Sequence, residues 1–79
     1  MDRHILANWI EEALKDLGGI GTVLAVNKHI WQHHQQELEA SGDFFFKWQY
    51  EVRWAAHKLK EQGRLRLSAR GKRGLWELV

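Results

Sequence analysis

The sequence predicts a small, mainly helical α+β domain in which three helices are followed by a C-terminal two-stranded β-hairpin. Two observations carry this prediction. Apolar residues recur at helical spacing in three successive segments separated by glycines, whereas residues 64–67 and 75–78 alternate between apolar and polar side chains. A chain of 79 residues has room for one hydrophobic core, so we expect a single domain over residues 1–79.

The first helix is expected from about Asp2 to Leu17. Asp2 is a suitable N-cap, and the pair Gly18-Gly19 is a strong signal for the end of a helix. The apolar residues of this segment fall on one broad stripe that we expect to face the core, namely Leu6, Trp9, Ile10, Ala13, Leu14 and Leu17.

A short extended link, residues 20–22, is expected next. Thr22 can cap a second helix, which ends near the segment 40–42. Its apolar face consists of Val23, Val26, Ile30, His34 and Leu38, with Trp31 at the border.

The third helix is expected to start at the N-cap Asp43 and to end before Gly63. Its inward stripe is Trp48, Val52, Ala55 and Leu59, bordered by Ala56, and its opposite face carries Gln49, Tyr50, Arg53, His57 and Lys60. The run 44–46 is Phe-Phe-Phe, and one helix face cannot bury three consecutive aromatic residues. At least one of them is therefore expected to pack against the first or second helix.

The C-terminal hairpin consists of two predicted strands joined by the basic loop, residues 68–74, which carries Arg70, Lys72 and Arg73. Three helices closed by such a hairpin are typical of a winged helix-turn-helix. We expect Trp76 and Leu78 in the core, and Trp54 between the third helix and the hairpin.

Composition and charge narrow the function classes. The chain has no cysteine, which excludes disulfides and thiolate zinc sites, and no apolar run long enough for a membrane span. Its opening residues do not resemble a signal peptide, so we expect a cytoplasmic protein. Residues 58–73 hold seven Lys or Arg against one Glu, an asymmetry that indicates an anionic partner.

The stretch from Val52 to Leu59, with its Trp54-Ala55 pair, precedes Gly63, two strands and the final segment 74–78. This pattern resembles the N-terminal winged-helix domain of Mrr-type restriction enzymes, which cut modified DNA. The likeness covers residues 45–79, and the first two helices only by pattern. The whole chain is also similar to small stand-alone bacterial proteins of unknown role, through Trp31 and residues 41–43 and 48–50. Since 79 residues leave no space for a nuclease domain as well, the resemblance implies DNA recognition without hydrolysis.

For double-stranded DNA, we expect the third helix to lie in the major groove. Gln49, Arg53 and His57 are the candidates for base edges, because Arg and Gln can form paired hydrogen bonds with guanine and adenine. Phosphate contacts are expected from Tyr50 or Lys60 and from Lys47. The loop cations Arg70, Lys72 and Arg73 are expected on phosphates or in the minor groove.

Other functions have weaker signals. His29 and His33 have a metal-compatible i, i+4 spacing, but no third ligand is evident nearby and His34 lies on the apolar face, so we expect no metal site. No nucleophile or cleft pattern indicates an enzyme, a cofactor or a small-molecule substrate. The alternative function is a protein-interaction or homodimerisation module with an exposed aromatic patch, formed by Trp31, Phe44, Phe45 and Tyr50.

Overall fold

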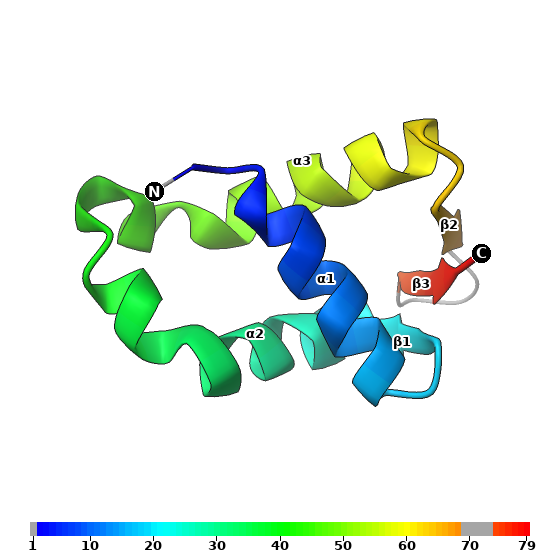
Figure 1. The fold of residues 1–79 in the computed structure, drawn as a ribbon, viewed down its shortest axis with the longest axis horizontal. Helices are drawn as coiled ribbons and strands as arrows, with labels where there is room; N and C mark the ends of the chain where they lie inside the picture. The colour runs from blue at the N-terminus through cyan, green and yellow to red at the C-terminus, as the bar shows by residue number, and fades with distance from the viewer. Residues whose placement is uncertain (1, 69–73) are drawn as a thin grey trace.

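A computed structural model describes residues 2–68 and 74–79, and it confirms the mainly helical α+β class. The order of elements is α1 (Ile5–Asp16), β1 (Ile20–Thr22), α2 (Val23–Glu39), the 3-10 helix η1 (Gly42–Phe46), α3 (Trp48–Glu61), β2 (Leu65–Ser68) and β3 (Leu75–Leu78). α1 packs on both α2 and α3, and the small sheet lies at one end of the three helices (Figure 1). No helix in the described part of the chain is long and apolar enough to cross a membrane.

α1 buries most of its predicted stripe, but it begins later than expected. The helix starts at Ile5, and the Asp2 carboxylate accepts a hydrogen bond from the backbone N–H of His4 at 2.9 Å. Asp2 therefore caps a turn that precedes the helix, and its assignment as the helix N-cap was wrong. At the other end Leu17 is the C-cap and is exposed, so it does not belong to the buried stripe.

The expected link at residues 20–22 forms a third strand, which the sequence did not predict. β1 pairs antiparallel with β3, and β3 also pairs with β2, so β3 is the central strand. In this register Trp76 lies between Gly21 of β1 and Leu67 of β2, with its side chain buried. A Cβ atom at Gly21 would lie 2.9 Å from Leu17 Cδ1, the end of an exposed side chain, so β1 lies close to the end of α1.

α2 begins as predicted, because Thr22 Oγ1 accepts a hydrogen bond from the backbone N–H of Ala25 at 3.0 Å. The helix is irregular at His34, where φ is −130° and ψ is 24°. The His34 ring stacks on the Trp9 ring of α1 with centroids 3.9 Å apart, so this histidine packs on the apolar side as predicted. The buried apolar residues of α2 are Val26, Ile30 and Leu38.

The start of α3 differs from the prediction. Asp43 lies within η1, and the N-cap of α3 is Lys47, which makes no side-chain capping bond. The 3-10 helix accommodates the aromatic run: Phe44 enters the core, and the Phe45 ring meets the Trp31 ring of α2 edge-on at 6.0 Å. Burial of Phe44 thus sets the path into α3, and the prediction that part of the run packs against an earlier helix is confirmed.

Trp54 does not lie between α3 and the hairpin, so that prediction was wrong. Its ring contacts the N-terminal segment, with the Arg3 guanidinium carbon 3.9 Å from the ring centroid and the His4 ring at 5.3 Å. The sheet meets the C-terminal end of α3 (Figure 1), whereas Trp54 is the seventh of the 14 residues of the helix.

Candidate nucleic-acid interface

The solvent face of α3 brings together most of the residues that the sequence predicts for DNA contact. The set is exposed throughout and consists of Lys47, Gln49, Tyr50, Arg53, His57 and Lys60. On the opposite side, α3 is held by Trp48, Val52, Ala55, Ala56 and Leu59, all buried. Burial of this side fixes the helix in place, and the polar side chains on the other side are exposed to solvent.

Three cations of this face have no hydrogen-bonding or acidic partner among the described residues. Within residues 2–68 and 74–79, the side chains of Lys47, Arg53 and Lys60 take part in no hydrogen bond or ion pair. Since they are exposed and unpaired there, they are available to an anionic partner without the loss of an internal contact.

Other cations of the basic half have acidic partners on the protein. Arg64 donates to Glu11 at 2.8 Å, Arg66 lies 3.8 Å from Glu77, and Lys58 lies 3.5 Å from Glu61. Among the described residues of the basic half, the cations without acidic partners are therefore Lys47, Arg53 and Lys60, which lie in α3 or directly before it.

A flank of α3 is attached to the start of the chain. The Arg3 guanidinium pairs with the Glu51 carboxylate and also covers the Trp54 ring. Cation–π contacts of this kind contribute about 0.5–1 kcal/mol at exposed sites. Arg3 is thus an orienting residue for α3 that the sequence alone did not single out, because its partners lie far along the chain.

The loop cations Arg70, Lys72 and Arg73 lie outside the described residues. The ends of the basic loop are described: Ser68 pairs with Leu75 in the sheet, and the carbonyl of Gly74 accepts a 3.4 Å hydrogen bond from the N–H of Val23. This bond links the residue directly before β3 to the start of α2.

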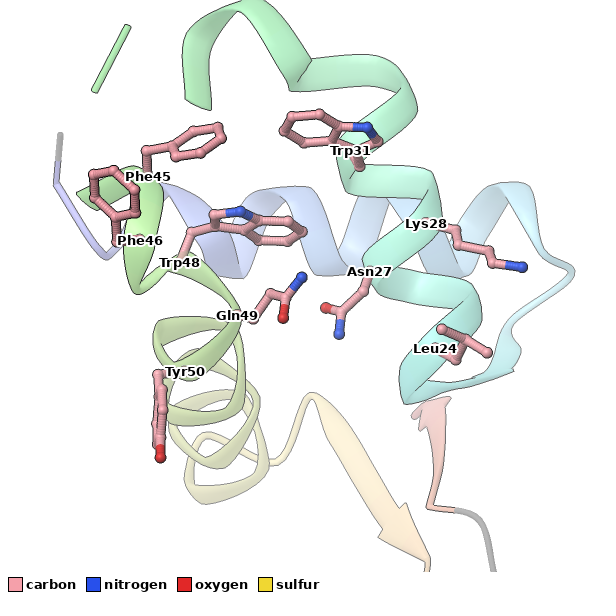
Figure 2. Close-up of a pocket in the computed structure, with 9 residues that line it drawn as sticks. All are labelled: Leu24, Asn27, Lys28, Trp31, Phe45, Phe46, Trp48, Gln49 and Tyr50. Atoms are coloured by element: carbon pink, nitrogen blue, oxygen red, sulfur yellow. The ribbon is translucent and has the colours of Figure 1, made fainter. Parts of the chain in front are cut away.

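An open apolar pocket of about 680 Å³ adjoins the α3 face (Figure 2). The wall from α2 is Leu24, Asn27, Lys28 and Trp31, and the opposite wall is Phe45, Phe46, Trp48, Gln49 and Tyr50. The side-chain amides of Asn27 and Gln49 point toward one another across it (Figure 2). Asn27 Oδ1 is buried and has no hydrogen-bond partner among the described residues, so the pocket contains an unused acceptor.

The structure changes which aromatic residues can form the exposed patch of the alternative function. Phe44 is buried and cannot contribute, whereas Trp31 and Phe45 are partly buried and line the pocket. Tyr50 is 82% exposed, and Phe46, which the prediction omitted, is 84% exposed. Phe44 was therefore wrongly assigned to the exposed patch, and the exposed ring of the triple-phenylalanine run is that of Phe46.

A cluster of one carboxylate and two imidazoles lies at the end of α1. A carboxylate oxygen of Asp16 and one ring nitrogen each from His29 and His33 lie within 4.8 Å of one another. This is the group of the described residues whose donor set could hold a metal ion.

No protein-family model, curated protein or solved structure matches this chain. The resemblance to the Mrr-type winged-helix domain therefore stays a prediction.

Proposed function

We propose that this chain is a DNA-binding winged-helix module without catalytic activity, in which α3 enters the major groove. The observation that carries the proposal is the solvent face of α3, where Lys47, Arg53 and Lys60 are exposed and unpaired within the described residues. The order of α2, α3 and a C-terminal hairpin supports the winged-helix assignment.

Each side chain of the face has a role that follows from its chemistry. Arg53 reads guanine and Gln49 reads adenine, because each can form two parallel hydrogen bonds with a base edge. His57 also reaches base edges. Lys47, Tyr50 and Lys60 contact phosphates, and so do the loop cations Arg70, Lys72 and Arg73; these contacts position the protein without reading sequence.

The size of the domain limits the strength of such binding. A single module of this kind buries about 600–1,000 Å² of protein surface on DNA. Tight, specific binding therefore requires a second copy of the chain or another protein on the same site.

An NMR titration of the ¹⁵N-labelled chain with a short mixed-sequence duplex tests the proposal. We expect amide shifts on the solvent face of α3 and in residues 69–74. Arg53→Ala should lose the α3 shifts, whereas Lys15→Ala, an exposed cation on α1, should keep them at the same net charge. The absence of shifts, or equal losses in both variants, would contradict a DNA site on α3.

A second candidate function is supported by the pocket rim. Phe46 and Tyr50 are each more than 80% exposed beside an apolar pocket, and contiguous exposed apolar patches are typical of protein interfaces. In this alternative the chain is a protein-interaction or homodimerisation module. Analytical ultracentrifugation distinguishes the two: dimerisation that Phe46→Ser abolishes, together with no DNA binding at about 50 mM salt, favours the interaction module.

A further inference from the structure

We infer that Asp16, His29 and His33 form a binding site for a single divalent transition-metal ion of the zinc type. Asp16 is the last residue of α1, and the two histidines lie one helical turn apart on α2. The spacing of the histidines was visible in the sequence. The third ligand was not, because Asp16 belongs to a different helix and only the packing of α1 on α2 brings it to the pair.

The donor set matches the chemistry of such an ion. Zinc is bound by imidazole nitrogens and carboxylate oxygens at about 2.0–2.2 Å, so ligand atoms around a tetrahedral ion lie about 3.3 Å apart. Here His29 Nε2 donates a hydrogen bond to Asp16 Oδ2 at 2.8 Å, so a metal ion would take the place of the shared proton, and the three candidate atoms lie within 4.8 Å of one another. Asp16 and His33 are exposed, so their side chains are free to rotate toward an ion bound by His29.

His33 has the tautomer that metal-bound histidines usually have. Its Nδ1 lies 2.9 Å from the backbone carbonyl oxygen of His29. A carbonyl can only accept, so Nδ1 carries the proton, and the lone pair of the neutral ring is on Nε2. Metal-ligating histidines commonly donate their other ring N–H to a carbonyl in this manner, which fixes the tautomer.

His29 is held in place by burial and stacking. It is 9% exposed, and the His33 ring stacks on it with centroids 3.9 Å apart. Because the lone pair of an imidazole lies in the ring plane, the exposed His33 ring must rotate out of this stack to direct Nε2 at an ion held by His29. One ligand is thus fixed by the core, while the other two lie at the surface and leave room for a water molecule in the fourth position. A bound ion links the end of α1 to the middle of α2.

Calorimetric titration of the tag-free, chelator-treated chain with ZnCl₂ tests this site. We expect one zinc ion per chain. Asp16→Asn and His33→Ala should each weaken binding at least about 10–100-fold, the loss seen when even an outer-shell partner of a metal ligand is removed. Both residues are exposed, so these variants should keep the parent circular-dichroism spectrum. His57→Ala, an exposed histidine on α3, is the matched control and should bind zinc like the parent.

Two further readouts separate this site from loose surface binding. The Co²⁺ complex should show the visible absorption of low-coordinate cobalt, and this absorption should disappear in His33→Ala. Zinc should also raise the melting temperature of the parent and of His57→Ala by the same amount, and that of Asp16→Asn by less at the same zinc concentration. The inference is overturned if the parent binds no zinc, or if Asp16→Asn or His33→Ala binds it as tightly as the parent.

Discussion

Replacement of Trp76 by Ala probes the centre of the fold. Trp76 is 5% exposed and lies on the central strand, in register with Gly21 on one side and Leu67 on the other. Truncation of a buried Trp to Ala removes packing contacts with both the helices and the sheet, and such changes cost about 3–5 kcal/mol.

This loss is large for so small a domain. At the usual 0.05–0.15 kcal/mol per residue, a 79-residue domain has a total free energy of unfolding of about 4–12 kcal/mol. Trp76→Ala should therefore lose at least about a quarter of the total free energy of unfolding, and at the lower end of this range it should be unfolded at 25 °C. Urea denaturation followed by far-UV circular dichroism measures the change without relying on tryptophan fluorescence.

Tyr50→Ala is the matched control, because it also removes an aromatic ring but from a side chain that is 82% exposed. Its free energy of unfolding should stay within about 0.5 kcal/mol of the parent. A Trp76→Ala protein as stable as Tyr50→Ala would refute the position of β3 at the centre of the sheet.

Three other substitutions test separate parts of the structure. Thr22→Ala removes the capping oxygen of α2 and should cost about 0.5–2 kcal/mol in urea denaturation, whereas Thr22→Ser should recover most of the loss; equal stability of all three proteins would exclude the cap. Ile10→Val in the fully buried part of α1 should cost about 0.5–1.5 kcal/mol, and a neutral change would indicate a loosely packed core. Joint replacement of Arg70, Lys72 and Arg73 by Ala should weaken binding to mixed duplex DNA and flatten its salt dependence, with little change in melting temperature; a large loss of stability would show that these cations are structural.

The sequence predicted correctly those helices and strands whose apolar residues recur at a regular spacing within a short segment. The inward stripe of α3, from Trp48 to Leu59, and the alternation in residues 75–78 were read directly from residue spacing, and the structure confirms the helix and the strand. The cap at Thr22 was likewise predicted, since its hydrogen bond reaches only three residues along the chain.

The features that were missed depend on partners distant in the sequence. β1 is three residues long, and its hydrogen bonds come from β3 at the other end of the chain. Trp54 was placed wrongly because its partner Arg3 lies in the N-terminal segment. Asp43 failed as a cap for a different reason, since burial of Phe44 favoured a 3-10 helix over an immediate start of α3.

The candidate DNA-binding site likewise has one feature that the sequence predicted and one that it did not. Spacing placed Gln49, Arg53 and Lys60 on one exposed helix face, and the structure places them there. The sequence could not show which cations lack acidic partners, because the ion pair of Arg64 with Glu11 joins residues 53 positions apart.

The salt dependence of binding to a mixed-sequence duplex, measured by fluorescence anisotropy for the parent, Lys60→Ala and Lys15→Ala, tests the proposed function most directly. Each lost phosphate contact should reduce the magnitude of the slope of log K against log salt by about 0.9. We expect this reduction for Lys60→Ala and an unchanged slope for Lys15→Ala, although both variants lose one positive charge. No binding at about 50 mM salt, or the same slope for all three proteins, would contradict DNA recognition through α3.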